Sequence, residues 1–140
     1  MLQKVRPFTA ADVEKVAEMF VSVPDGWSKT ALEESLANSS IKSFVLEADG
    51  LVAAFASYLV YDDAELVFVV TDETQKRKGY GKTLLADTLS TLNMPCVLEV
   101  RESNTPAIRL YEKLGFALIG TRKNFYSTPR ENALIYKLDN

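Results

Sequence analysis

Two apolar runs with strand-forming composition, 42–48 and 51–60, flank the dipeptide Asp49-Gly50. Asp-Gly between such runs is a strong hairpin signal, because both residues tolerate the positive φ angles of a tight turn. A third run, 65–70, follows after a short polar stretch. The sequence therefore predicts three consecutive antiparallel strands, which commits the middle of the chain to a sheet.

The period of the apolar residues becomes helical after Gly79. One side of the following segment carries Leu84, Leu85, Thr88, Leu89 and Leu92, which predicts a helix. Residues 95–100 return to a strand pattern, and Asn104 or Thr105 can cap a further helix. The core side of that helix would consist of Ala107, Leu110, Tyr111 and Leu114, and Gly115 suits the position after its end.

The two ends of the chain complete the predicted elements. Residues 3–7 form a strand pattern, and Thr9 can cap a helix whose apolar positions reach Phe20. A second helix, capped by Ser28 or Thr30, would extend to about Ala37. Residues 116–122 and 132–138 predict a final hairpin. The predicted order is β-α-α-β-β-β-α-β-α-β-β, which is an α/β fold.

Composition narrows the possible functions. The 140 residues fit one domain, 1–140, and the net charge of -3 argues against a general nucleic-acid binder. The N-terminus has no apolar stretch of secretory length, and no run approaches the length of a membrane span, so we expect a cytoplasmic protein without a membrane partner. The chain has no histidine and one cysteine, so we expect no metal site, and a catalytic acid or base must be Asp, Glu, Tyr, Lys or Cys.

The segment QKRKGYGKTLL, residues 75–85, ends like a nucleotide-binding P-loop. That motif requires a glycine where this chain has Lys76, and a dinucleotide fingerprint would require one at Leu84, so neither pattern is complete. Four cations nevertheless surround Gly79 and Gly81 at the predicted helix start, where free N–H groups favour an anion. A pyrophosphate is a good candidate, and a merely solvated basic turn is the alternative.

Glu99 and Tyr111 are candidates for chemistry. Glu99 lies within the apolar stretch VLEV, so in a strand it points away from Leu98 and Val100, and it is either functional or on an exposed strand face. Tyr111 lies on the predicted core stripe and could equally be a packing residue.

Several segments of the chain resemble the GNAT superfamily of acyl-CoA-dependent N-acyltransferases. KRKGYG is similar to the family's loop, although Lys76 stands where the family has Gln or Arg. The stretch LEVRESNTPAIRLYEKLGF, residues 98–116, is similar to the signature of the bacterial ribosomal-protein alanine N-acetyltransferases. GWS at 26–28 and RKNFYSTPRENALIYKL at 122–138 also resemble segments of that family.

The resemblance implies a mixed, mostly antiparallel sheet flanked by helices, with acetyl-CoA as co-substrate. It implies that Glu99 acts as the base and Tyr111 as the proton donor to the departing thiolate. The implied cofactor-binding residues are Val69, Val70, Thr71, Lys76, Arg77, Lys78, Gly79, Tyr80, Gly81, Lys82, Thr83 and Asn104. Trp27, Phe125 and Tyr126 could form the walls of a peptide groove.

The implied activity is acetylation of the N-terminal alanine of a small-subunit ribosomal protein by direct attack of the amine on the thioester. We expect a monomer whose partners are acetyl-CoA and that N-terminal segment. A small amine or a lysine side chain is the alternative acceptor. A non-catalytic acyl-CoA-binding module is the alternative from another class.

Overall fold

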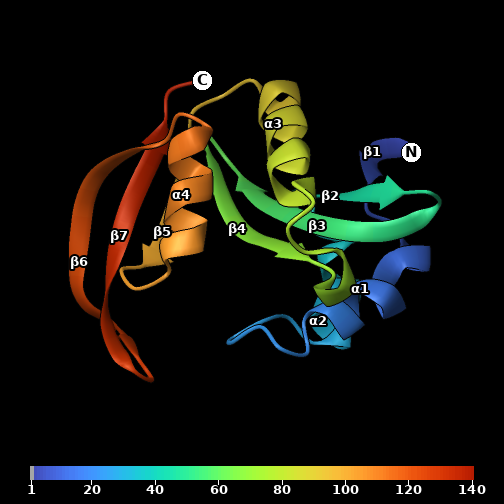
Figure 1. The fold of residues 1–140 in the computed structure, drawn as a ribbon, viewed down its shortest axis with the longest axis horizontal. Helices are drawn as coiled ribbons and strands as arrows, with labels where there is room; N and C mark the ends of the chain where they lie inside the picture. Colours follow the sequence, from blue (N-terminus) through green and yellow to red (C-terminus); the bar gives the residue numbers. More distant parts are fainter. Residues whose placement is uncertain (1) are drawn as a thin grey trace.

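A computed structural model describes residues 2–140, and within them seven strands form one sheet (Figure 1). The strands are β1 Gln3–Pro7, β2 Ile41–Ala48, β3 Leu51–Val60, β4 Ala64–Thr71, β5 Cys96–Arg101, β6 Ala117–Ser127 and β7 Arg130–Leu138. The α-helices are α1 Val13–Met19, α2 Lys29–Ser35, α3 Tyr80–Leu92 and α4 Thr105–Lys113, and η1 Ala10–Asp12 and η2 Glu73–Gln75 are short 3-10 segments.

The strands lie in the order β1-β2-β3-β4-β5-β7-β6. Neighbouring strands are antiparallel except β4 and β5, which are parallel. This confirms the expected mixed, mostly antiparallel sheet and the predicted order of elements. The final hairpin is longer than predicted, and β7 rather than β6 lies next to β5.

Local signals account for most element ends. Asp49 and Gly50 have φ angles of 52° and 82°, as the tight turn between β2 and β3 requires. Ser28, not Thr30, caps α2, because its Oγ accepts the Ala31 N–H at 3.1 Å. Thr9 precedes one 3-10 turn before α1 begins, which the apolar spacing alone does not reveal.

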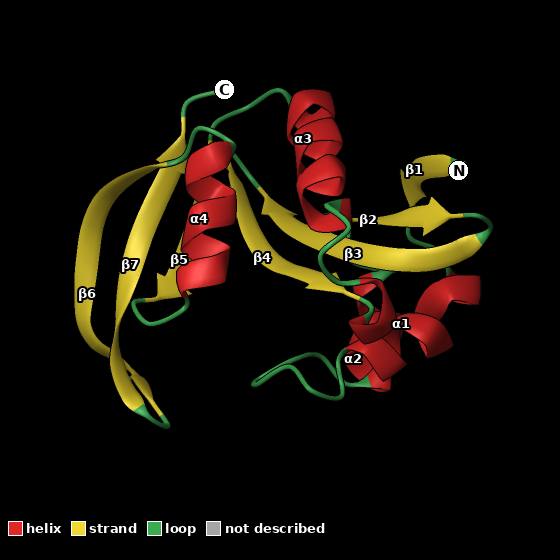
Figure 2. Cartoon of the chain, in the orientation of Figure 1, coloured by secondary structure: helices red, strands yellow, loops and turns green. Residues whose placement is uncertain are grey.

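The sheet has a core on each face, and helices cover both faces (Figure 2). Residues of α3 and α4 pack on one face, against side chains such as Leu46 and Leu98. Residues of α1 and α2 pack on the other, against side chains such as Val45 and Phe55. Alternation along the strands therefore directs every second residue to a different set of helices.

None of the helices in residues 2–140 has the length and hydrophobicity needed to cross a membrane.

Candidate active site

The sheet splits between β4 and β5, and the region where these two strands no longer pair is called the seam. The two strands pair only at Ala64 with Cys96 and at Glu65 with Val97, which are the first two residues of each strand. Beyond these pairs β4 continues alongside β3 and β5 alongside β7, and the two strands diverge (Figure 1). Within residues 2–140, the edge of β4 from Leu66 to Thr71 has no strand partner on this side. An extended ligand could bond to these backbone groups, and Val69, Val70 and Thr71 lie along this edge.

Helix α3 begins beside the end of β4. Gly79 caps it with φ 78°, in the left-handed region that favours glycine. The first intrahelical bond runs from Thr83 N to Gly79 O at 3.0 Å, so the N–H groups of Gly81 and Lys82 precede the ladder and have no helical acceptor. These groups and the helix dipole make a site for an anion.

The basic side chains of this loop are exposed. Lys76 lies 2.9 Å from a carboxylate oxygen of Glu73, and Lys78 donates to Gln75 at 2.9 Å. Both contacts are at the surface and easily exchanged for a ligand. Arg77 and Lys82 form no ion pair within the described residues 2–140.

Gly81 joins the loop to the seam. A Cβ at this position would lie 3.5 Å from Thr71 Oγ1 and 4.0 Å from Leu110 Cδ2, so Gly81 lies close to both the end of β4 and α4. Tyr80 is different, because the residue is 2% exposed and its side chain belongs to the core. Only the main chain of Tyr80 can face a ligand here.

Asn104 caps α4, and its Oδ1 accepts the Ala107 N–H at 3.3 Å. Of the two predicted caps the structure therefore selects Asn104, and Gly115 with φ 99° ends the helix as expected. The side chain of Asn104 is exposed, so the same residue remains accessible to a ligand.

Glu99 lies on β5 where the seam has opened. Its side chain is 26% exposed, and its Oε1 is 3.5 Å from Nε of Arg122 on β6. Its Oε2 is buried and accepts no hydrogen bond from the residues that the structure describes. A buried carboxylate oxygen without a donor is costly, which indicates that a ligand or water supplies the donor.

Tyr111 reaches the same region from α4. The residue is 8% exposed and packs on Phe116, with ring centroids 5.8 Å apart. Burial raises the pKa of the Tyr111 hydroxyl to about 12, and the nearby hydroxyl of Tyr126 contributes. Within residues 2–140 this hydroxyl has no hydrogen-bond partner, so it can donate to a ligand.

Tyr126 completes the cluster from the end of β6. Burial raises the pKa of its hydroxyl, and the negative charge of Glu99 adds to this effect. Tyr126 therefore contributes to the raised pKa of Tyr111, and Glu99 contributes to the raised pKa of Tyr126. Phe125 is half exposed and packs edge-on against Tyr126 with centroids 5.1 Å apart.

Trp27 lies on the other side of the seam. Its ring packs edge-on against Phe68 of β4 at 5.1 Å between centroids, within the core under α1 and α2. Leu98 and Val100 belong to the opposite core, so alternation directs Glu99 to the face that carries Trp27. Tyr126 thus interacts electrostatically with both Glu99 and Tyr111, and Trp27 lies against β4 on the same face as Glu99, whereas the ring of Tyr111 belongs to the core on the opposite face.

Three charged residues on the same face of the sheet as Glu99 were not among the predicted site residues: Arg101, Arg122 and Glu131. The strand registers pair Arg101 with Ala133 and Arg122 with the same residue, so both project to the face of Glu99. One signal was available in the sequence, since Arg101 follows Glu99 at the two-residue spacing of one strand face.

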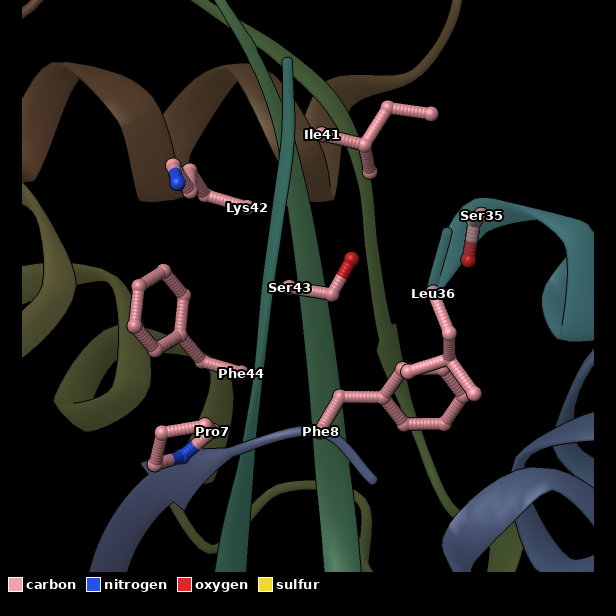
Figure 3. A pocket seen from close by; sticks show the side chains of 8 residues that line it. All are labelled: Pro7, Phe8, Ser35, Leu36, Ile41, Lys42, Ser43 and Phe44. Atoms are coloured by element: carbon pink, nitrogen blue, oxygen red, sulfur yellow. The ribbon is translucent and has the colours of Figure 1, made fainter. Parts of the chain in front are cut away.

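Two cavities lie away from the seam. One, of about 260 Å³, lies where β1 ends beside α2 and β2, and its walls include Phe8, Leu36 and Ser43 (Figure 3). The other, of about 390 Å³, lies beside the hairpin of β2 and β3 and contains the ion pairs of Arg6 with Asp12 and of Lys15 with Asp72. Neither is lined by Glu99 or Tyr111, and the reactive groups lie in the open seam instead.

Comparison with known proteins gives consistent matches. Residues 12–116 match the acetyltransferase (GNAT) family. The chain is 34% identical over 134 residues to the ribosomal protein bS18-alanine N-acetyltransferase of Haemophilus ducreyi, covering 91% of this chain and 89% of that protein. Identity to the protein of the same name from Escherichia coli strain K12 is 41% over 103 residues, which cover 69% of this chain and 70% of that protein.

A solved structure shows the same fold. The crystal structure of the ribosomal-protein-S18-alanine N-acetyltransferase from Escherichia coli has a TM-score of 0.87 and 30% identity, covering 99% of this chain and 94% of that one. The similarity therefore includes both sides of the seam.

Proposed function

The chain belongs to the acetyltransferase (GNAT) family, and from this premise we propose that it transfers the acetyl group of acetyl-CoA to the N-terminal alanine of ribosomal protein bS18. The named activity of its relatives supports this acceptor. The buried, unpartnered oxygen of Glu99 is the observation that best supports the site. Such a reaction would take place in the cytoplasm, where ribosomal proteins are made.

Glu99 is the proposed base. An N-terminal amine has a pKa of about 7.7 to 8.0, so most of it is protonated at pH 7 and cannot attack a carbonyl. The Glu99 carboxylate would accept that proton directly or through a water at Oε2. General bases of this kind contribute about 10²- to 10⁴-fold.

Tyr111 is the proposed donor to the leaving sulfur. Its pKa of about 12 keeps the phenol protonated throughout the working range of pH. That value lies roughly 3.5 pKa units above that of an ordinary thiol, about 8.5, so complete proton transfer to a thiolate is unfavourable. We therefore assign Tyr111 the role of a hydrogen-bond donor that stabilises the charge developing on sulfur.

The residues along the seam fit acetyl-CoA. When bound, acetyl-CoA supplies an acetyl thioester at one end and a pyrophosphate further along. The N–H groups of Gly81 and Lys82, with the cations of residues 76–78, would bind the pyrophosphate oxygens. The free edge of β4 from Val69 to Thr71 would hold the extended arm, and the exposed Asn104 at the start of α4 would contact it from the other side.

The acceptor would enter on the face of Glu99. Trp27 lies against β4 on this face, and Phe125 and Tyr126 lie on the β6 side. Aromatic side chains offer large, rigid contact areas to an extended peptide. This arrangement supports a peptide acceptor more than a free small amine.

The test offers the protein acetyl-CoA and two peptides. One peptide has a free N-terminal alanine, and the other is N-blocked but contains lysine. Mass spectrometry then locates the acetyl group. Label on the alanine amine alone supports the proposal, whereas label on lysine contradicts the proposed acceptor. Acetyl-CoA binding without label on either peptide would favour a small-amine acceptor or a non-catalytic module.

A further inference from the structure

Arg101 makes an unusual number of contacts with the tip of the last hairpin. Its guanidinium donates to Pro129 O at 3.0 Å, to Thr128 O at 3.3 Å and to a carboxylate oxygen of Glu131 at 3.2 Å. The same guanidinium lies 4.2 Å above the ring of Tyr126. One side chain of β5 therefore contacts the end of β6, the turn and the start of β7.

Glu131 extends these contacts to the loop before α4. Its second oxygen accepts the Ser103 N–H, and the pair with Arg101 is largely buried, with side chains 21% and 13% exposed. Glu102 N also donates to Asn132 O at 3.2 Å. The turn that follows β5 and leads to the cap of α4 is thus fastened to the hairpin that carries Tyr126.

The contacts of Arg101 with residues 126–131, here called the clamp, lie close in the sequence and on the sheet to the candidate site. Arg101 lies two residues beyond Glu99 on the same strand and the same face. It therefore fixes Tyr126 relative to the strand that carries the carboxylate. We propose that Arg101 is a positioning residue for acceptor binding, because it holds Tyr126 and the hairpin tip, residues 126–131, against the Glu99 side of the seam. This inference rests on the proposed acetyl transfer to a peptide.

Lysine cannot replace Arg101 in this role. The planar guanidinium serves two carbonyls and a carboxylate at once while its face lies on an aromatic ring. An ammonium is a compact point charge that cannot form this set of contacts. Arg101→Lys should therefore behave almost like Arg101→Gln, although it keeps the charge.

The first measurement does not depend on the acceptor. Hydrogen–deuterium exchange is compared in Arg101→Gln, in Arg101→Lys and in the control Arg109→Gln. Arg109 is exposed on α4 and forms no ion pair within residues 2–140, so the control removes the same charge without the clamp. We expect faster exchange in 124–132 and 102–105 in both Arg101 variants, with α3 unchanged. Unchanged exchange in the hairpin would overturn the proposal that Arg101 holds the hairpin tip in place.

The second measurement separates acceptor binding from chemistry. Steady-state kinetics with the N-terminal alanine peptide should show KM raised about tenfold or more in both Arg101 variants, with kcat within about threefold and acetyl-CoA affinity unchanged. In a Tyr126→Ala background, Arg101→Gln should add little to KM, because a residue that acts through another loses its effect when that residue is removed.

If the effects of Arg101→Gln and Tyr126→Ala on KM were additive, Arg101 would not act through Tyr126, and the proposal would be contradicted. Equal losses in acetyl-CoA affinity and acceptor KM would indicate a general structural role and also overturn the proposal. If the wild-type protein acetylates no peptide, the proposed function fails, and the exchange data alone then decide whether Arg101 holds the hairpin.

Discussion

At the scale of single residues, Tyr111 shows how burial prepares a side chain for chemistry. Its ring lies among the core residues of α4 and Phe116, and the apolar surroundings raise the pKa of its hydroxyl to about 12. Desolvation disfavours the phenolate, so the group keeps its proton. The hydroxyl is still free to donate at the seam, which combines a fixed position with an available hydrogen.

Tyr111→Phe should lower kcat about 10²-fold or more while acetyl-CoA affinity stays nearly unchanged, because only the hydrogen-bond donor is lost. In the wild type, kcat should not decline between pH 8 and 10 through loss of this proton, since the raised pKa lies well above that range. Tyr136→Phe is the matched control, a buried tyrosine whose hydroxyl bonds to Glu112 instead. Near-normal turnover of Tyr111→Phe would remove Tyr111 from the proposed role.

Arg6 and Asp12 form the best-connected ion pair of the described residues. Two guanidinium nitrogens of Arg6 each donate to one oxygen of Asp12 at 2.8 Å, and Nε donates to Glu47. Asp12 is 5% exposed and also accepts the Thr9 N–H at 2.9 Å. The hydrogen bonds from Arg6 hold the pKa of Asp12 below its usual value.

Arg6→Met should lower the free energy of unfolding at pH 7 by roughly 2–3 kcal/mol, because it leaves Asp12 charged, buried and without its cation. A depressed carboxyl pKa adds stability above its unfolded value of about 3.9, and this stability is lost as the pH falls below it. The difference between wild type and variant should therefore shrink in urea unfolding at pH 3. Lys29→Met, which removes an exposed pair with Glu14, should change stability by less than about 0.5 kcal/mol at either pH. A difference that stays constant with pH would contradict the assigned linkage.

Much of the candidate site could be predicted from local sequence. Glu99 stands out as an acidic residue in an apolar strand, and the glycines at 79 and 81 mark the start of α3. The partners of Glu99 could not be predicted, because Arg122 and Tyr126 reach it only through the register of β7 with its two neighbours. Tyr80 was predicted to bind the cofactor, and its burial in the core depends on helix packing that a motif does not encode.

At the scale of elements, the loop from η2 to α3 is the part of the fold most specialised for a ligand. Gly79 sets the entry to the helix with a left-handed conformation, and Gly81 leaves no side chain between the helix start and the neighbouring Thr71 and Leu110. A short 3-10 turn, anchored by the pair of Asp72 with Lys15, precedes the basic residues. The loop is therefore held at its start by this ion pair and at its end by helix α3.

Gly81→Leu should abolish measurable acetyl-CoA binding in calorimetry, because the side chain would fill the space where β4, α3 and α4 approach each other. The added Cβ itself meets only ordinary contacts at 3.5 Å or more, so the fold should survive and circular dichroism should be unchanged. Ala86→Leu adds similar bulk on the exposed side of α3 and should bind normally. Unchanged binding in Gly81→Leu would move the pyrophosphate to another place.

Element types followed from periodicity and turn chemistry, but their arrangement did not. The hairpin at Asp49-Gly50 and the end of α4 at Gly115 agree with local rules. The extension of β6 to Ser127 depends on pairing with β7, which stabilises a polar stretch that has no strand pattern of its own. The divergence of β4 and β5 is also a long-range property, since nothing in either strand marks where their pairing ends.

At the scale of the whole molecule, one sheet separates two cores. Phe55 is fully buried in the core under α1 and α2, and Leu84 is fully buried in the core under α3 and α4. Both cores use the same strands, with alternate residues of β2 and β3 on each side. The two cores should therefore form and unfold together, as expected for one domain over residues 1–140.

Phe55→Ala should cost about 3–5 kcal/mol and Leu84→Ala about 2–5 kcal/mol of unfolding free energy, because each leaves a cavity in a packed core. Trp27 is the only tryptophan and lies in the Phe55 core, so its fluorescence reports that side, while circular dichroism reports the whole chain. In urea, both signals should show one coincident transition in each variant. Separate transitions would indicate two independently folding halves and contradict the single domain.

The seam between β4 and β5 also affects how long the protein persists in a cell. The sheet is mechanically weak between β4 and β5, because these strands pair only at one end. A ligand that bonds to both strands there would act as an eighth strand and would connect the two parts of the sheet. If acetyl-CoA is that ligand, mass action adds about 1.4 kcal/mol of stability for each tenfold rise in its concentration above Kd. The resistance of the chain to proteolysis would then follow the acetyl supply, so that a starved cell clears this enzyme sooner than a growing one.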